Sequence, residues 1–315
     1  MIKNKIILFI YKIKNIFGLS SHDTSTLLGK SNERYRRILL TGGSTAIVKI
    51  LSASINLITV PLTLNYLGAE RYGLWMAISS IMVLMSFADL GLGNGLLNAI
   101  SKAHGRKSIK EAQIAVSSTF YMLLSISGIL FLILLIIYPF IEWQIVFNAQ
   151  SKLAIEESGP TIFVLVITFL INMPLGVVQR IQDGYQEGFK FQIWLIIGSI
   201  FSLAGLLICI YLETGLPWLV LAFSSGQLIA VLFNGILLFS KRRKELRPRL
   251  TYFDFTIAKY LFNAGLIFFF LGIFTLLGNA SDNIVLAHTL GTASVAGYEI
   301  VKKVFLFSMF TQFII

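Results

Sequence analysis

The sequence predicts an all-α membrane protein, a polytopic helical bundle with about eight transmembrane helices. Of its 315 residues, 56% are hydrophobic and only 13% are charged, and the mean hydropathy is +0.80. These values lie outside the range of soluble domains. The apolar runs are also long enough for helices, which need about 20 residues to cross a hydrocarbon core of roughly 30 Å. They lack the period-two alternation of membrane β-strands.

Eight apolar runs define the expected membrane spans. The connections between them are short, and the longest outer one, 139–160, has only about twenty residues, so the bundle itself is the expected functional unit. Cys209 is the only cysteine and lies in the fifth span, which leaves no intrachain disulfide or cysteine metal site. The spans cover approximately residues 38–64, 72–98, 114–138, 160–180, 191–212, 217–239, 258–288 and 295–315.

Basic residues set the expected orientation in the membrane. Of the 26 Lys and Arg, 21 fall in residues 1–37 and in loops on the same side, whereas Arg71 and Lys152 lie in loops on the other side. Because cytoplasmic loops carry the excess of basic residues, the N-terminus is expected in the cytoplasm. Its basic and apolar start is expected to lie at the membrane surface rather than to be a cleaved leader.

The same count accounts for the net charge of +11, so the sequence predicts no nucleic acid partner. It also isolates three lysines inside spans, which are Lys49, Lys302 and Lys303.

A short internal repeat divides the chain. A shift of 223 positions aligns Ser52 and Asn56 with Thr275 and Asn279. Two six-helix halves of the same orientation, as in membrane proteins built from parallel repeats, would produce this pattern. We therefore expect a cytoplasmic segment 1–37, a first lobe 38–240, a basic linker 241–257 and the start of a second lobe 258–315. Since that second lobe would hold only two helices, we expect a fragment of a protein of about twelve spans; a natural end at Ile315 is the alternative.

The first span carries a polar stripe with a lysine in its middle. Spacings of three and four residues place these side chains on one helix face. Lys49 lies roughly 16 Å from the cytoplasmic end, at about 1.5 Å per residue. A lysine that faces lipid there costs at least about 2.5–3.5 kcal/mol, so we expect Lys49, Ser52 and Asn56 to line a bundle interior or a wet cavity. Helix packing through small polar residues is the alternative for Ser52 and the threonines. The stripe comprises Thr41, Thr45, Lys49, Ser52, Asn56, Thr59 and Thr63.

The second span holds an acid followed by glycines. A break in the helix is expected at membrane depth, where it is tolerated if the backbone is buried in protein or lines a cavity. Asp89 lies at a depth close to that of Lys49, so an ion pair between the two spans is expected. That pair either neutralises the lysine or takes part in coupling to a proton or cation. The residues of the expected break are Gly91, Gly93, Asn94 and Gly95.

Polar residues recur in the last two spans. Asn279 is the repeat partner of Asn56 and is expected to line the lumen, while Asp282 is either a coupling carboxylate or a solvated residue near the outer end. Glu299 precedes Lys302 and Lys303 by three and four positions, so one of the two lysines can pair with it. The other is expected to face a lumen or to reach the interface.

Two polar segments are interpreted as intracellular connections. "VVQRIQDGYQEGFKFQ" (177–192) follows the fourth span, and a gate or entrance is its alternative interpretation. "KRRKELRPR" (241–249) is expected to be a solvated loop or to meet lipid headgroups.

The sequence lacks the constellations of an enzyme. It has no Asp-x-Asp pair, no His-Glu-x-x-His and no phosphate-binding loop, and its three histidines are scattered. "GLGNG" (91–95) lacks the spacing and the strand context of a nucleotide fingerprint. We therefore predict no enzymatic activity, no metal and no cofactor.

Two stretches are similar to a known family. "VPLTLNYLGAERYGLWMAISSIMVLMSFADLGLGNGLLNAISKAHG" (60–105) and "SDNIVLAHTLGTASVAGYEIVKKV" (281–304) resemble bacterial polysaccharide and O-antigen flippases. These flippases belong to the multidrug, oligosaccharidyl-lipid and polysaccharide exporter superfamily. The similarity runs from about residue 36 onward, and this chain departs from the family's twelve to fourteen helices by lacking the C-terminal ones.

The resemblance implies a fold and a function. Two lobes would enclose a central cavity, and alternating access would move an undecaprenyl-pyrophosphate-linked oligosaccharide across the bacterial inner membrane. It also implies a proton or sodium gradient as the driving force and other glycan-assembly membrane proteins as partners. In such a cationic lumen, Lys49 and Lys302 or Lys303 would offset the pyrophosphate charge, and the neighbouring polar groups would meet sugar hydroxyls.

Two alternative functions are open, and the second belongs to another functional class. A cation-coupled drug exporter of the same superfamily would favour an acidic cavity, whereas three lysines dominate here. A membrane glycan polymerase or ligase would need a larger outer loop than 139–160.

Overall fold

A computed structural model of the protein describes residues 26–85 and 87–290. No strand occurs in these residues, which confirms the predicted all-α membrane bundle. The chain forms two compact units, Met1–Gly265 and Leu266–Ile315. The first unit contains helices α2 to α8 and the start of α9, and everything below refers to it unless the second is named.

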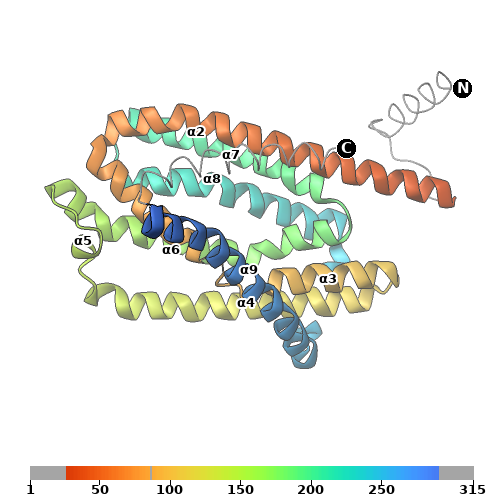
Figure 1. Cartoon of the computed structure of the whole chain (residues 1–315). Helices are drawn as coiled ribbons and strands as arrows, with labels where there is room; N and C mark the ends of the chain where they lie inside the picture. Colours follow the sequence, from red (N-terminus) through yellow and green to blue (C-terminus); the bar gives the residue numbers. More distant parts are fainter. Residues whose placement is uncertain (1–25, 86, 291–315) are drawn as a thin grey trace, which may run out of the picture. The chain divides into compact units, whose positions relative to one another are not determined.

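The first two predicted spans form one long element, α2 (Leu27–Met85), which is divided by a turn. At Gly68 the backbone takes φ 74° and ψ 169°, a conformation available almost only to glycine. The chain reverses there, and Figure 1 shows the two arms of α2 meeting at one end of the unit. The turn therefore makes two spans from 59 residues without a longer loop.

The helix of the second span is broken as predicted. The break lies before most of the residues that were predicted to form it. Helix α3 (Leu92–Gly105) begins after Leu90 and Gly91, which both have positive φ. The Asp89 carboxylate accepts hydrogen bonds from the N–H groups of Gly91 (2.9 Å) and Gly93 (3.3 Å), so it caps the new helix. Of the expected break residues, only Gly91 lies at the break.

Gly93, Asn94 and Gly95 lie inside α3, and the two glycines have a packing role instead. A Cβ atom on Gly93 would lie 2.9 Å from Nε of Arg180, and one on Gly95 would lie 2.8 Å from the Leu261 carbonyl oxygen. Glycine is thus required at position 95, where the Leu261 backbone approaches closely, whereas a Cβ at position 93 would need the Arg180 side chain to shift.

The remaining described spans follow the hydropathy pattern. They are α4 (Ile109–Ile137), α6 (Lys152–Gly184), α7 (Gly188–Tyr211), α8 (Leu216–Leu237) and α9 (Phe255–Leu290). A single helical turn, α5 (Trp143–Val146), lies between α4 and α6. Ser108 and Ser151 cap α4 and α6 by accepting backbone hydrogen bonds at 3.3 Å. The eighth predicted span, 295–315, lies outside the described residues.

Small side chains bring the helices together, as is usual in membranes. Helix α7 packs along α8, α8 along α6, and α3 against α4 and α6. Where α7 meets α8, Gly226 lies directly against Ser202. Between α6 and α8, Gln182 and Asn234 exchange two buried amide hydrogen bonds, at 2.8 and 3.2 Å, which satisfies both side chains in the apolar interior.

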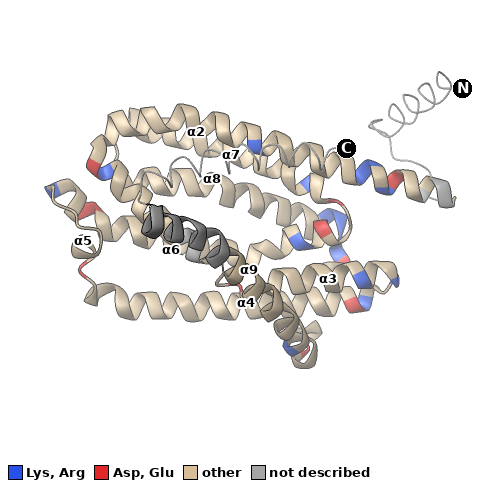
Figure 2. Ribbon diagram, viewed as in Figure 1, with Lys and Arg blue, Asp and Glu red and all other residues tan. Residues whose placement is uncertain are grey.

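Basic residues gather at one end of this unit. Figure 2 shows the Lys and Arg residues concentrated where α2 begins, where α3 meets α4 and where α6 meets α7. Arg71 follows the turn of α2 and Lys152 is the first residue of α6, and Figure 2 shows few basic residues at that end of the unit. The two ends therefore carry the charge asymmetry from which the orientation was predicted.

An ion pair links three helices at the end of the unit that holds the α2 turn. The Arg71 guanidinium donates to both oxygens of Glu157, at 2.6 and 2.7 Å, and the two side chains are 14% and 13% exposed. Glu157 also accepts from the Leu216 N–H at the start of α8 (3.0 Å). One carboxylate therefore links α2, α6 and α8.

Arg71→Ala is expected to destabilise the protein by about 2–3 kcal/mol, because it leaves the Glu157 carboxylate mostly buried without its cation. The measurement is thermal unfolding of the purified protein in detergent. Lys152→Ala is the matched control, since Lys152 is exposed at the same end. Equal midpoints for the two variants would contradict the prediction.

Candidate functional site

The polar stripe of α2 has a buried edge and an exposed edge. At about 100° per residue, Ser52 and Thr59 lie within about 20° of Thr41 around the helix, whereas Asn56 and Lys49 lie about 60° and 80° away. Burial follows this rotation, because Thr59 is only 5% exposed while Lys49 and Asn56 are exposed. Ser52 lies between these extremes and is half-buried.

The threonines of the stripe have structural contacts. The Thr41 hydroxyl accepts a hydrogen bond from the Phe189 N–H at the start of α7 (3.2 Å). Thr45 and Thr63 donate to the carbonyls of Thr41 and Thr59 one turn earlier, both at 2.7 Å. The alternative reading, helix packing, thus fits the threonines. Lys49 and Asn56 remain as candidate substrate contacts on the exposed edge, and half-buried Ser52 remains as a candidate between the two edges.

For the other predicted site residues, the structure describes only some contacts or only the backbone. The contacts that the structure gives Asp89 are with backbone N–H groups, so its ion pair with Lys49 stays a prediction. In the second unit, the backbone of Asn279 and Asp282 is helical within α9. Their side chains, and all of Lys302 and Lys303, lie outside the described residues.

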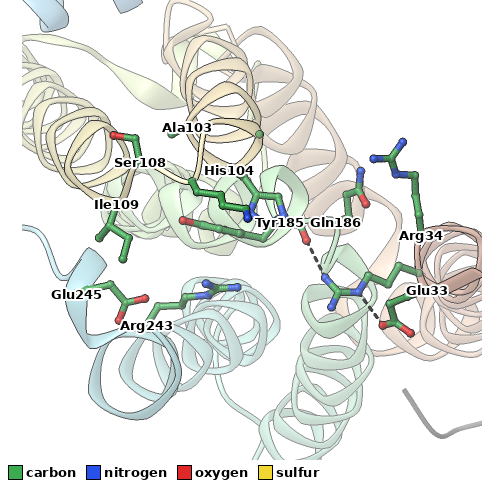
Figure 3. A pocket seen from close by; sticks show the side chains of 13 residues that line it. Glu33, Arg34, Ala103, His104, Ser108, Ile109, Tyr185, Gln186, Arg243 and Glu245 are labelled. Atoms are coloured by element: carbon green, nitrogen blue, oxygen red, sulfur yellow. Dashed lines mark hydrogen bonds and ion pairs between the residues drawn. The ribbon is translucent and has the colours of Figure 1, made fainter. Parts of the chain in front are cut away.

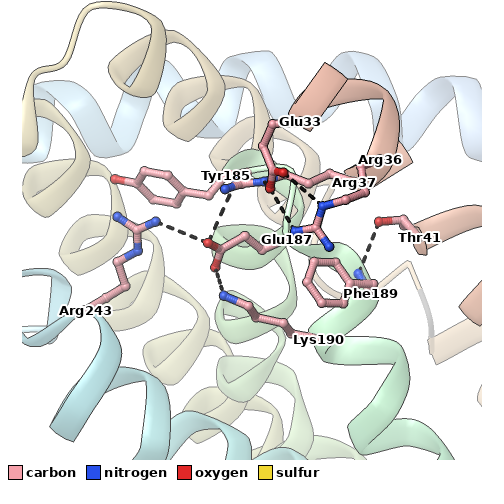
Figure 4. A network of polar contacts seen from close by, with 9 residues as sticks. All are labelled: Glu33, Arg36, Arg37, Thr41, Tyr185, Glu187, Phe189, Lys190 and Arg243. Carbon is pink, nitrogen blue, oxygen red and sulfur yellow. Dashed lines mark hydrogen bonds and ion pairs between the residues drawn. The ribbon is translucent and has the colours of Figure 1, made fainter. Parts of the chain in front are cut away.

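A dense group of charged side chains lies at the basic end of the first unit (Figure 4). Glu33, only 5% exposed, accepts from Arg36 (2.9 and 3.0 Å) and from Arg37 (2.9 Å) on the same helix face. Glu187, between α6 and α7, lies 2.7 Å from Lys190 and 3.6 Å from Arg243. We call this group the Glu33–Glu187 cluster; it comprises Glu33, Arg36, Arg37, Glu187, Lys190 and Arg243.

Arg37 joins the two halves of the cluster. Its Nη1 donates to the Tyr185 carbonyl (3.1 Å) and lies 3.9 Å from Glu187. Tyr185 follows the end of α6, and the left-handed φ of Gln186 (59°) turns the chain so that Glu187 faces α2. The cluster therefore fastens the start of α2 to the connection between α6 and α7.

A cavity of about 650 Å³ opens beside the cluster (Figure 3). Tyr185 is 7% exposed and lies between two cationic or titratable groups. The Arg243 guanidinium covers its ring face at 3.9 Å from the centroid, and the His104 ring meets it edge-on at 4.8 Å. The cavity is also lined by Glu33, Arg34, Arg37, Lys107, Ser108, Gln186 and Glu245.

The surroundings of His104 disfavour its charged form. Partial burial, and then the nearby Arg243 and Arg37, lower its pKa below the usual 6.5, while Glu187 acts in the opposite direction. The folded protein therefore binds a proton here less readily than the unfolded chain does. The contribution of His104 to folding stability therefore falls as the pH drops through about 6.5.

His104→Gln is expected to reduce the loss of thermal stability between pH 7.5 and pH 5.5, because Gln cannot take up the proton that the folded state disfavours. The effect is modest, since the ring is partly solvated. Unfolding midpoints at the two pH values test this. An unchanged difference between the midpoints would show that His104 does not contribute.

Sequence reasoning missed this cluster and cavity. Residues 1–37 and 241–249 were interpreted as cytoplasmic or solvated segments, and 177–192 as a polar connection. Arg37 and Tyr185 are 148 positions apart, so nothing in local spacing could pair them. The available signal was that acidic Glu33 and Glu187 stand three or four positions from basic residues, which indicates each half of the cluster but not their meeting.

Comparison with known proteins agrees with this architecture. The family model described as polysaccharide biosynthesis protein matches residues 40–314. A putative O-antigen transporter of Salmonella typhi is 27% identical over 279 residues, which cover 86% of this chain and 61% of that protein. A putative O-antigen transporter of Salmonella typhimurium is 30% identical over 76 residues, 24% of this chain and 18% of that protein.

Solved structures show the same fold. The outward-facing structure of a multidrug resistance MATE family transporter of the MOP superfamily superposes with a TM-score of 0.70 at 18% identity, over 87% of this chain and 61% of that one. A MOP superfamily transporter from Pyrococcus furiosus gives the same values. This chain thus spans about 61% of the length of these relatives. Since the family model matches residues 40–314, the chain belongs to the polysaccharide biosynthesis protein family.

Proposed function

We propose that the chain takes part in moving an undecaprenyl-pyrophosphate-linked oligosaccharide, an O-antigen or capsule repeat unit, across the bacterial inner membrane by alternating access. The family match and the relatives named O-antigen transporters support this proposal. The single observation that carries it is Lys49, an exposed cation deep in a membrane-spanning helix. In this proposal the N-terminus is cytoplasmic, as the basic end of the first unit suggests.

The chemistry of the substrate fits the exposed edge of α2. A pyrophosphate carries charge into a region of low dielectric constant, where a nearby ammonium group offsets much of the cost. Ser52 and Asn56, three and seven positions after Lys49, offer hydroxyl and amide groups to sugar hydroxyls. Asp89 is the proposed charge partner or coupling carboxylate. Asn279, Asp282, Lys302 and Lys303 are the contributions proposed for the second lobe.

A cation-coupled drug exporter is the second candidate. The multidrug transporter structures favour it at the level of the fold, although 18% identity carries no information on substrate. Export of cationic drugs would call for an acidic site in place of Lys49. Drug-susceptibility assays in a strain without its own exporters distinguish the two: resistance conferred by this chain would favour the second candidate.

The test of the proposed function is restoration of a surface glycan. The chain is expressed in a host that lacks its own flippase but retains the matching glycan genes, alone and together with the C-terminal part of the Salmonella typhi relative. A surface-glycan ladder in either case supports the proposal. Absence of a ladder in both cases, with both polypeptides present in the membrane, would overturn it.

A further inference from the structure

We propose that the cavity beside Tyr185 is a binding site for a phosphate-bearing anion. The site lies at the basic end of the first unit and is separate from the Lys49 edge in the middle of α2. The inference therefore stands without the proposed transport function. It rests on the charge balance, on the donors that converge on the cavity, and on the cavity's size.

Each of the two carboxylates in the Glu33–Glu187 cluster contacts more than one cation. Glu33 is bonded by two arginines, and Glu187 lies within 4 Å of three cations, namely Arg37, Lys190 and Arg243. Such sharing leaves positive charge uncompensated in a partly desolvated place, which costs free energy. A bound anion would remove that cost.

Further cations line the cavity itself. Its walls carry Arg34, Arg37, Lys107 and Arg243 against only two acids, Glu33 and Glu245. Among the described residues, neither Arg34 nor Lys107 takes part in an ion pair. Both line the cavity and are exposed, so they can meet a charged ligand.

The donors come from separate elements and are held in place. Arg243, which follows α8, is fixed by the Tyr185 ring on one side and by Glu187 on another. His104 reaches the same ring from the end of α3, and Figure 3 shows both groups directed toward the cavity. Planar guanidinium groups held in this way suit the oxygens of a phosphate, which accept paired hydrogen bonds.

The size of the cavity excludes a bare ion as its full occupant. About 650 Å³ is within the range of small-molecule sites and holds far more than one phosphate group. The phosphate is therefore expected to carry an organic group. Two sources share this chemistry: the headgroup of an anionic lipid at the membrane surface, or a soluble phosphate compound.

The experiment measures binding of inorganic pyrophosphate to the purified chain in detergent, by calorimetry and by thermal stabilisation, with sodium chloride matched for ionic strength. Saturable binding is expected. Arg243→Ala should raise Kd by at least about tenfold, the loss expected when one charge-assisted hydrogen bond is removed. Arg106→Gln is the control, because Arg106 lies at the same end, pairs with exposed Glu111 and does not line the cavity.

A second variant covers the case in which Arg243→Ala fails to fold. The double variant Arg34→Gln with Lys107→Gln changes only exposed side chains and should raise Kd about threefold or more. Absence of saturable binding, or equal effects of the double variant and Arg106→Gln, would overturn the proposal.

Reconstitution distinguishes the two sources. Bilayer discs of phosphatidylcholine alone are compared with discs that also contain phosphatidic acid. Competition by phosphatidic acid against pyrophosphate identifies the lipid headgroup as the ligand, and unchanged affinity identifies a soluble compound. Both outcomes support the site. Because transport is not measured, a failure of the proposed function leaves this test unaffected.

Discussion

Lys49→Ala is expected to abolish the surface-glycan ladder or to weaken it at least tenfold, whereas Lys49→Arg keeps most of it. The reason is the charge of the proposed substrate. A hydrogen bond to a charged group contributes about 1.5–3 kcal/mol in protein, or roughly ten- to a hundredfold. Lys49→Glu should abolish the ladder, because it places like charge against the pyrophosphate in a medium of low dielectric constant.

The ladder is measured in whichever form of the complementation experiment restores it, at matched expression in the membrane. Ser54→Ala is the control, since Ser54 is exposed on the same helix at a similar depth but on a different face, where it donates to the Ile50 carbonyl. Equal ladders from Ala, Arg and Glu at position 49 would remove the lysine from the mechanism. The site on α2 would then be only a packing surface.

The helices of this protein could be predicted from sequence because hydropathy and spacing are local properties. Apolar runs of about 20 residues located the described spans, and the spacing of the polar stripe identified one face of α2. The burial of Thr59 and the exposure of Lys49 show that the stripe has two edges, which spacing alone did not resolve. Which edge is covered depends on the helices that pack against α2, which are α7, α6 and α8.

The glycines of the second span show a second limit of prediction from sequence. Their number predicted a break, but a helix breaks where the backbone needs a left-handed residue and an acceptor for its freed N–H groups. Gly91 and Asp89 meet these needs, while Gly93 and Gly95 serve contacts with Arg180 and Leu261. A glycine in a sequence does not reveal which of the two reasons applies.

The charge cluster as a whole could not be predicted, because its two halves, one around Glu33 and one around Glu187, come together only through tertiary structure. Glu33 lies on α2, Glu187 lies in the connection between α6 and α7, and Arg243 comes from a third segment. A count of charges along the chain gives membrane orientation, since that depends on sums over loops. It cannot show which acids are shared and which cations remain uncompensated.

Gly226→Ala is expected to destabilise the bundle by about 2–3 kcal/mol, the upper part of the usual range for overpacking. The new Cβ would overlap with the backbone nitrogen and hydroxyl of Ser202 and would lie 2.7 Å from its Cα. Backbone atoms cannot rotate away as the end of a side chain can, so α7 and α8 must move apart. That movement would loosen one of the principal packed pairs of the first unit.

Thermal unfolding in detergent measures this effect, and Gly176→Ala is the matched control. Nothing lies within 4 Å of a Cβ at Gly176, so the substitution should be neutral or stabilising by up to about 1 kcal/mol through helix propensity. Adding Ser202→Gly to Gly226→Ala separates the two sources of overlap. Because Ser202→Gly removes only the hydroxymethyl group, recovery should be incomplete; full recovery would show that the side chain, and not the backbone contact, limits how closely α7 and α8 approach.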